Sequence, residues 1–396
     1  MTAPPSRARR LPGTLYAYMF TSHLVLLYPV YSLLFVDTGL SVPEISSLFV
    51  VWSVTGIVLE VPSGAWADTF SRRWLLALGP LFAGAGFALW VAFPSYWAFL
   101  VGFVLWGVES ALTSGSLEAL VYEELERVGA ADRYARVMGR ARAASEFGIV
   151  TAMVVAGPVL ALGGYHTVGI ASVLACMVAA AIALFFPEHR ERADADDQPG
   201  YLATLRAGVR EVRVDPAVRR ALLVLPLVMG VWDALEEYVP MLALEKGAAP
   251  TAVPWVMLLV WLGVTCGGLL APFGERLGAK GVAGLLVVGA LALAAGSLFG
   301  ALSGFLVVAA GFCAFRLASV VIDARLQDAI AGPSRATVTS LAGLGSGVLT
   351  VLLYAGYAAA SAGMSHGAIF AMFAAPYLVL AVALAAAEER RPARVQ

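Results

Sequence analysis

Residues 64–73 read Gly-Ala-Trp-Ala-Asp-Thr-Phe-Ser-Arg-Arg, where one long apolar run, 44–66, gives way to a polar loop before the next run, 74–93. A helix needs about 20 apolar residues to cross a bilayer, and each of these runs has that length. The loop ends in two arginines, and arginine is retained on the cytoplasmic side of membrane proteins. The segment therefore predicts two membrane spans joined by a short cytoplasmic loop.

Composition indicates that the rest of the chain is of the same kind. Of its 396 residues, 60% are hydrophobic and 13% are charged, whereas soluble domains carry about 25% charged residues. A net charge of -1 gives no basic surplus for binding nucleic acid. The three cysteines and four histidines show neither metal-ligand spacing nor a disulfide framework. We therefore expect an all-α polytopic membrane protein without a cofactor or a bound metal.

Apolar runs and the breaks between them predict twelve transmembrane helices. The first run is too long for the core of a signal peptide, so it is expected to remain as an uncleaved span. The fifth run is the least regular, because Arg142 and Glu146 lie near its start. The predicted spans are 15–36, 44–66, 74–93, 97–121, 142–163, 167–186, 221–243, 252–272, 281–301, 304–328, 337–360 and 366–387.

The distribution of Lys and Arg orients these spans. With the N-terminus inside the cell, all of the 26 Lys and Arg residues except Lys246 and Arg316 lie in predicted cytoplasmic segments or, for Arg142 and Arg325, near the cytoplasmic ends of predicted spans. We therefore expect a multi-pass protein of the inner (plasma) membrane with both termini in the cytoplasm.

One long polar segment, 187–220, divides the chain into 1–186 and 221–396, with six predicted spans on each side. It contains an amphipathic stretch, 201–214, and is expected to be a cytoplasmic linker between two six-helix bundles.

A faint internal repeat supports two related halves. Asp68 in the loop quoted above aligns with Glu275 in the second half, and Glu118 aligns with Asp323 at a nearly equal offset. Parallel six-helix repeats are a known design of secondary transporters. The repeat therefore favours two pseudo-symmetric bundles.

The loop at 64–73 resembles the G-x-x-x-D-x-x-G-[RK]-[RK] signature between the second and third spans of the major facilitator superfamily, with Ser71 in place of the second glycine. The resemblance implies two six-helix bundles that open a central cavity alternately to either side. It also implies that this loop latches the halves together, although its arginines would equally serve orientation alone. The expected cytoplasmic gate consists of Gly64, Asp68, Arg72 and Arg73, with Glu118 and Asp323 near the inner face.

A second pattern of the superfamily is only partly present. Its proton-coupled exporters carry G-x-x-x-G-P-x-x-G-G on the fifth span, and here Gly157 and Pro158 match while Met153 replaces the first glycine. The pattern favours export slightly, and close packing of small residues explains it nearly as well.

Ionisable residues at the centres of spans cost roughly 2.5 to 3.5 kcal/mol on insertion scales, and they usually mark a transport path. In this sequence they occur on the first, fourth, seventh and tenth predicted spans. These are the spans that line the central cavity in the superfamily that the loop resembles. The residues are His23, Glu109, Asp233 with Glu236 and Glu237 one turn on, and Arg316.

Each of these residues has an expected role. Carboxyl groups in such surroundings bind and release protons, so Glu109 and Asp233 are predicted to couple transport to protons. Three alternatives stay open: Glu109 and Arg316 as a structural pair, His23 as a packing residue, and Glu237 as a solvated vestibule residue. With two central tryptophans, the predicted substrate-binding set is His23, Trp106, Glu109, Trp232, Asp233, Glu236, Glu237 and Arg316.

These observations predict a proton-coupled antiporter for efflux of a cationic or zwitterionic drug or metabolite, as in multidrug export. The reason is that carboxylates outnumber cations among the central residues. Its expected partners are the bilayer, a small-molecule substrate and protons, and we expect a monomer. No phosphate-binding loop motif occurs, so ATP is not expected to drive it.

Other classes of function compete with this prediction. A proton-coupled importer (symporter) of a nutrient would differ in the direction of flux, and a uniporter would move no protons. A non-transporting receptor or scaffold has little reason to bear the cost of central charges. An enzyme is not expected, because the sequence lacks a Ser/His or metal-spaced constellation.

Overall fold

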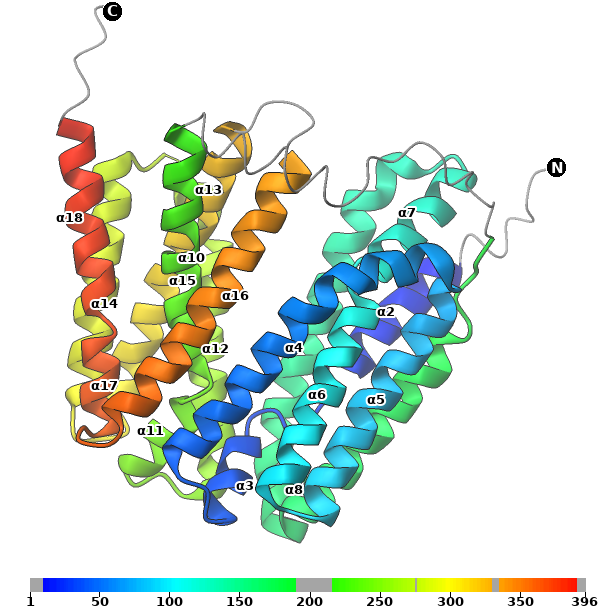
Figure 1. The fold of residues 1–396 in the computed structure, drawn as a ribbon, viewed down its shortest axis with the longest axis horizontal. Coiled ribbons are helices and arrows are strands. Elements are labelled where there is room, and N and C mark those ends of the chain that lie inside the picture. The colour runs from blue at the N-terminus through cyan, green and yellow to red at the C-terminus, as the bar shows by residue number, and fades with distance from the viewer. Residues whose placement is uncertain (1–9, 190–215, 275, 330–334, 390–396) are drawn as a thin grey trace, which may run out of the picture. The chain divides into compact units, whose positions relative to one another are not determined.

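The computed structural model describes residues 10–189, 216–274, 276–329 and 335–389, and these are helical with no strand among them (Figure 1). They cluster into two compact units. The first takes in the described residues of Met1–Ala193 and Pro250–Trp255, and the second those of Asp194–Ala249 and Val256–Gln396. Most of the predicted linker, 187–220, lies outside the described residues.

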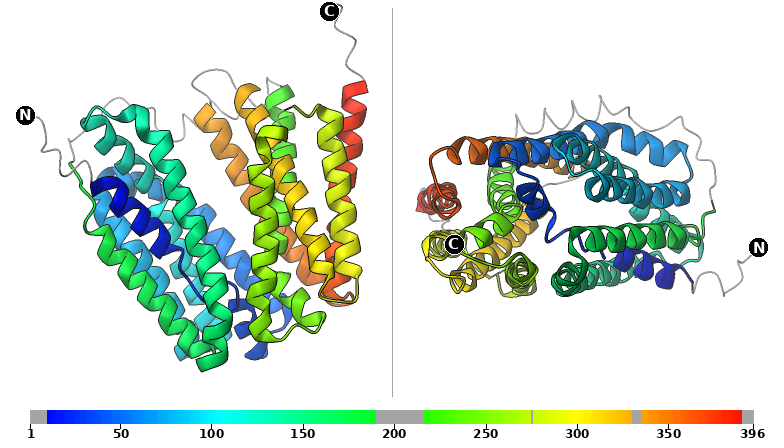
Figure 2. Two further views of the ribbon diagram at one scale, coloured as in Figure 1. Left: turned by 180° about the vertical axis from the view of Figure 1, so that it is seen from behind. Right: turned by 90° about the horizontal axis from the view of Figure 1, so that it is seen from below.

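The first unit is a bundle of helices around one long helix. Its elements are α2 (Arg10–Ser22), α3 (Tyr31–Asp37), α4 (Val42–Thr69), α5 (Arg72–Ala92), α6 (Tyr96–Thr113), α7 (Ser116–Arg127), η1 (Ala131–Arg133), α8 (Tyr134–Ala183) and η2 (Pro250–Ala252). α2 lies along α8 (Figure 2), α5 packs on α6 and α8, and α4 packs on α6. α8 bends at Gly163 and Gly164, and Gly164 has φ +64°, a conformation that favours glycine. The bend separates the fifth and sixth predicted spans.

The second unit is also a helical bundle. Its elements are α10 (Pro216–Glu236), α11 (Val239–Glu245), α12 (Val253–Leu269), α13 (Ala271–Gly274), α14 (Ala279–Leu298), α15 (Gly304–Ala329), α16 (Arg335–Ala360), α17 (His366–Met372) and α18 (Ala375–Glu389). α14 packs on α15, α17 and α18, while α10 packs on α15 and α16.

Every predicted span has a helical counterpart in the described part of the chain. Nine helical stretches there are long and apolar enough to cross a membrane, and one of them, Ala131–Ala183, contains two predicted spans. The two predicted spans outside these stretches, 15–36 and 221–243, are the broken helices α2/α3 and α10/α11. The breaks and the charges on these helices explain why a hydropathy criterion passes over them.

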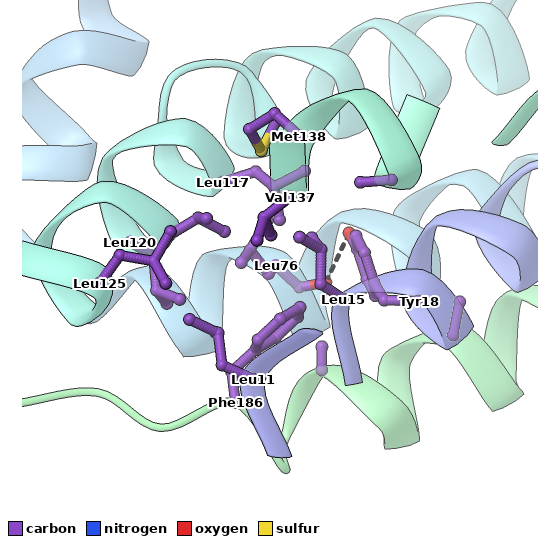
Figure 3. Packing of buried hydrophobic residues seen from close by; sticks show 14 of the residues in the cluster. Leu11, Leu15, Tyr18, Leu76, Leu117, Leu120, Leu125, Val137, Met138 and Phe186 are labelled. Atoms are coloured by element: carbon purple, nitrogen blue, oxygen red, sulfur yellow. Dashed lines mark hydrogen bonds between the residues drawn. The ribbon is translucent and has the colours of Figure 1, made fainter. Parts of the chain in front are cut away.

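A hydrophobic core holds α2, α5, α7 and α8 together at the predicted cytoplasmic end of the first unit (Figure 3). Within it the Tyr18 hydroxyl donates a hydrogen bond to the Leu76 carbonyl oxygen at 3.2 Å, and the Tyr18 ring meets Phe186 edge-on. The other buried members that Figure 3 labels are Leu11, Leu15, Leu117, Leu120, Leu125, Val137 and Met138.

Candidate functional site

Three of the four spans that carry central ionisable residues are broken helices. His23 follows the end of α2, in the non-helical segment before α3. Glu109 lies less than two turns before the break between α6 and α7, where Gly115 has φ +71°. Glu237 lies directly between α10 and α11. Irregular backbone at membrane depth is tolerated only where protein buries it or where it lines a cavity, so these breaks point to the same positions as the charges.

The first unit encloses a cavity of about 430 Å³. Small-molecule sites are usually about 300 to 1,000 Å³ in volume. The cavity brings together His23, Trp106 and Glu109 of the predicted substrate-binding set. Glu118, which was predicted at the gate, also lines it. Among the described residues around this cavity there are two carboxylates and no Lys or Arg.

Glu109 is half-buried on α6 and lies against a glycine of the neighbouring helix. A Cβ atom at Gly79 of α5 would lie 3.5 Å from Glu109 Cγ, an ordinary contact, but only 2.8 Å from Thr113 Cγ2, so α5 comes this close to α6 because Gly79 has no side chain. The Thr113 hydroxyl lies 3.0 Å from the Glu109 carbonyl oxygen and 3.5 Å from the carboxylate. No Lys or Arg is among the described residues that line the cavity with this carboxylate.

Aromatic rings form one wall of this cavity around Trp106. Trp52 stacks on Trp106 with ring centroids 5.0 Å apart, Phe87 meets it edge-on at 5.2 Å, and Tyr28 does so at 6.4 Å. Trp106 lies one helical turn before Glu109 on α6. A cation within about 6 Å of an aromatic face is attracted to the ring, so this wall and the carboxylate favour the same kind of ligand.

His23 lines the same cavity, and its ring is held by contacts with the preceding turn of the chain. Its Nδ1 lies 2.9 Å from the Met19 carbonyl oxygen and 3.1 Å from the Ser22 hydroxyl. A carbonyl oxygen only accepts, so the Nδ1–H donates to it and Nε2 carries the lone pair. Gly148 of α8 approaches this turn closely, since a Cβ atom there would lie 3.4 Å from His23 Cβ.

The second unit places Asp233 and Arg316 within electrostatic reach of each other. Asp233 is exposed on α10, and Arg316 is half-buried on α15. A glycine again lies beneath the charged side chain, because a Cβ atom at Gly267 of α12 would be 2.9 Å from Arg316 Cβ. Arg316 thus has an anionic neighbour in its own half, as a permanently charged group requires.

The remaining predicted residues of α10 differ in their surroundings. Glu236 is buried and Glu237 half-buried, and both take part in interactions with other groups. Trp232 is buried against Phe312, with ring centroids 6.1 Å apart. Its indole N–H has no hydrogen-bond partner within the described part of the chain. Trp232 is therefore a buried side chain and is not on an open surface.

At the predicted cytoplasmic end of the first unit, Arg72 of the signature loop forms an ion pair with Glu123 of α7 at 2.5 Å. Its backbone N–H donates to the Glu188 carboxylate at 2.7 Å, and the Ser71 hydroxyl donates to the same carboxylate. Ser71 also accepts from the Trp74 N–H at the start of α5. The serine that departs from the family signature therefore connects α5 to the segment after the sixth span.

This segment, Pro187–His189, is held at a second point. The His189 backbone N–H donates to the Glu124 carboxylate at 2.7 Å, and His189 Nδ1 lies 3.0 Å from the same group. Glu124, Glu188 and His189 were not predicted from the sequence. The one sequence feature that could have indicated these contacts is that Glu188 and His189 follow the sixth span directly, on the same predicted side of the membrane as the arginine loop.

The other predicted gate residues are distributed between the units. Arg73 lines a small cavity with Glu188 and His189 in the first unit. Asp323 is half-buried on α15 of the second unit. Gly64 lies in α4, and the side chain of Asp68 is outside the described part of the structure. Glu275, the repeat equivalent of Asp68, is outside it as well.

These features define a polytopic membrane protein of two helical units with a ligand-sized cavity at broken helices. The sequence profile of the Major Facilitator Superfamily matches residues 11–354, and the chain therefore belongs to this superfamily. No protein with curated annotation is significantly similar to it in sequence.

Solved structures of transporters share the fold. A variant of the nucleoside transporter NupG has a TM-score of 0.74 at 16% identity, covering 95% of this chain and 99% of that one. An unoccupied, inward-facing bacterial homologue of the human lysosomal transporter Spinster has a TM-score of 0.68 at 16% identity, covering 96% and 97%. The human organic anion transporter MFSD10 (TETRAN) has a TM-score of 0.60 at 18% identity, covering 96% and 100%. At these identities the likeness shows the fold alone.

Proposed function

We propose that the protein is a proton-coupled secondary transporter that exports a small organic cation or zwitterion by alternating access. One observation carries this proposal: the cavity of the first unit is lined by two carboxylates and an aromatic wall, and by no Lys or Arg among its described residues. Such a lining attracts a positively charged, partly apolar molecule and repels an anion.

In this scheme Glu109 binds the charge of the substrate and Trp106 with Trp52 binds its apolar or planar part. A proton and a substrate cation compete for Glu109, because only the ionised carboxylate pairs with a cation. Protonation from the outer side therefore releases the cation there, and loss of the proton to the cytoplasm restores the site. This competition links proton entry to cation exit at Glu109.

Asp233 is the second coupling group of the proposal. When ionised it attracts Arg316 electrostatically, and when protonated it no longer offsets the charge of Arg316. The two states differ in the interactions of α10 with α15, and a ligand shifts a conformational equilibrium only through such a difference. His23, Trp232, Glu236 and Glu237 complete the proposed substrate-binding set around these groups.

The proposed arrangement in the membrane follows the Lys and Arg distribution, with both termini in the cytoplasm and the protein in the inner membrane. The gate is proposed to include Gly64, Asp68, Arg72 and Arg73, with Glu118 and Asp323 at the inner ends of their helices. The segments 1–186 and 221–396 are proposed to move as two bundles of one monomer about the linker 187–220.

Proton movement in inverted vesicles tests the function. A pH-gradient dye is followed while lipophilic cations are added to vesicles that contain the wild-type protein, Glu109→Gln or Asp233→Asn. We expect a cation to discharge the gradient in the wild type and in neither variant. If no cation moves protons although the purified protein is folded, cation antiport is wrong. An importer is distinguished by accumulation of substrate in vesicles of the opposite orientation.

A further inference from the structure

Two glutamates line the cavity of the first unit, one on each side of the break between α6 and α7. Glu109 lies on α6, and Glu118 lies in the first turn of α7. Positions 109 and 118 are nine residues apart, which is about two and a half turns, so their side chains would point to opposite sides of an uninterrupted helix. The helix is instead interrupted at Ser114 and Gly115, and both glutamates line one cavity.

A glycine makes this interruption possible. Gly115 has φ +71°, in the left-handed region that residues with a side chain rarely adopt. A carboxylate in the first turn of a helix also stabilises that helix, so the sequence position of Glu118 alone does not connect it with a ligand. The connection comes from its place in the lining of the same cavity as Glu109 and the aromatic wall.

Neither glutamate forms an ion pair with a residue that the structure describes. The Glu109 carboxylate lies 3.5 Å from the Thr113 hydroxyl. Glu118 is exposed and acts electrostatically on Tyr134, as Arg142 of α8 does, but this glutamate and this arginine do not pair with each other. The counter-charge for each carboxylate therefore comes from solvent or from a ligand.

The spacing of the two glutamates favours a ligand with two separate charges. Helical residues advance about 1.5 Å each, so positions 109 and 118 are about 13 Å apart along such an axis. Between them the hydroxyl-bearing residues Ser110, Thr113 and Ser114 line the cavity, and no charged residue does. A ligand with a single charge leaves one carboxylate without a counter-ion, whereas charge complementarity favours a ligand that matches both.

We infer that the substrate of this cavity is an elongated molecule with a positive charge at each end, such as a diamine or a bis-quaternary ammonium ion. Glu109 and the wall around Trp106 bind one end, and Glu118 binds the other, toward the predicted cytoplasmic side. The inference rests on the proposed function, because it names the substrate class of that same site. It gives Glu118 a part in substrate binding in addition to its proposed place at the gate.

The test compares dications with monocations of the same length. Bis(trimethylammonium)alkanes of increasing chain length, and alkyltrimethylammonium ions with the same chains, are titrated into the purified full-length protein in a calorimeter. At the best chain length the dication should bind about two- to fivefold more tightly than the monocation, the gain expected from one solvated ion pair. Dication affinity should pass through a maximum with length, whereas burial of apolar surface alone gives a steady rise.

Three variants locate the second charge. Glu118→Gln should remove the preference for the dication. Glu118→Asp keeps the charge and shortens the side chain, so the preference should remain with its maximum at a longer chain. Glu126→Gln is the matched control, since Glu126 is also an exposed glutamate of α7 but does not line the cavity. It should show the wild-type preference and the wild-type maximum.

The other possible results are each informative. Equal loss of affinity for both kinds of probe in Glu118→Gln would make this residue a general attractor of cations and would overturn the inference. A wild-type protein that binds monocations and dications equally would overturn it as well, while leaving the proposed function intact. A folded wild-type protein that binds neither kind of probe would contradict the proposed function and the inference together.

Discussion

The two halves of this transporter hold opposite charges at corresponding places. Arg316 follows Glu109 by the same number of residues as Glu275 follows Asp68 in the internal repeat. In each half a glycine of the neighbouring helix lies beneath the charged side chain, Gly79 in the first and Gly267 in the second. The two glycines are on non-equivalent helices, the third span (α5) and the eighth (α12), so each half packs its central charged residue in a different way.

The surroundings of Glu109 and Arg316 also differ. Glu109 lies in a cavity with an aromatic wall and no cation among its described lining residues. Arg316 lies near Asp233, an exposed carboxylate of α10. Under the proposed function this difference divides two tasks between the halves: the first binds the organic cation, and the second carries Asp233 and Arg316.

The largest effect should come from removing the charge of Glu109. Glu109→Gln should weaken binding of a lipophilic cation roughly 10- to 100-fold, because charged hydrogen-bonding pairs contribute about 1.5 to 3 kcal/mol and 1.4 kcal/mol is a factor of ten. Asp233→Asn, its counterpart in the other half, should change this affinity less than about threefold while it abolishes proton coupling. Quenching of tryptophan fluorescence in detergent measures the affinity. Equal losses in the two variants would contradict a division between the halves.

The next effect is a pH dependence that belongs to the first half alone. Cation affinity should rise with pH by up to about tenfold per unit, because a bound proton removes the charge of Glu109. The slope should disappear in Glu109→Gln and persist in Asp233→Asn. Titration of the same fluorescence signal at several pH values gives the slope, and a slope that survives in Glu109→Gln would locate the competing proton elsewhere.

The aromatic wall should contribute less than the carboxylate. Trp106→Leu should weaken cation binding about 3- to 30-fold, since cation–π contacts contribute about 0.5 to 2 kcal/mol. Calorimetry suits this variant because it needs no indole reporter. Trp97→Leu is the matched control, since Trp97 is on the same helix and 72% exposed. Loss of affinity in the control and not in Trp106→Leu would exclude the wall as the binding surface.

The smallest effect concerns Gly79, the glycine at which α5 packs closely on α6. Gly79→Ala would bring a Cβ atom to 2.8 Å from Thr113 Cγ2, and such overpacking costs about 1 to 3 kcal/mol. Thermal unfolding in detergent should show a lower Tm that Thr113→Ser partly restores, because serine lacks that methyl group. Gly56→Ala is the control, since a Cβ atom there meets nothing within 4 Å. An unchanged Tm in Gly79→Ala would show that α5 and α6 have room to separate.

The membrane spans and the central charges were accessible from the sequence, because both are one-dimensional patterns of hydropathy and charge. The aromatic wall around Trp106 could not be predicted from the sequence. Trp52 and Phe87 lie outside the four spans that carry central ionisable residues, and nothing in an apolar run shows which side of the helix faces a cavity and which faces lipid. Their selection requires the packing of α4 and α5 against α6.

The sequence patterns did not predict the helix breaks either. The run 15–36 remains apolar throughout, yet the helix ends at Ser22 and resumes only at Tyr31. The contacts of Glu188 and His189 were missed for a different reason. They connect the end of the sixth span to the start of the third, and such a pairing of distant loops is set by the bundle and not by local periodicity.

The broken helices have a consequence for biosynthesis. The spans that fail the hydropathy criterion, α2/α3 and α10/α11, are those that carry His23 and the α10 carboxylates. A central Asp adds about 2.5 to 3.5 kcal/mol to the free energy of insertion through the translocon. The α10/α11 segment, which carries Asp233, is therefore a poor candidate for entering the bilayer singly, and we expect it to be retained beside the insertion channel until α15 and α16, on which α10 packs, follow it. The polarity that makes a transport site possible thus sets the order in which the chain assembles in the membrane.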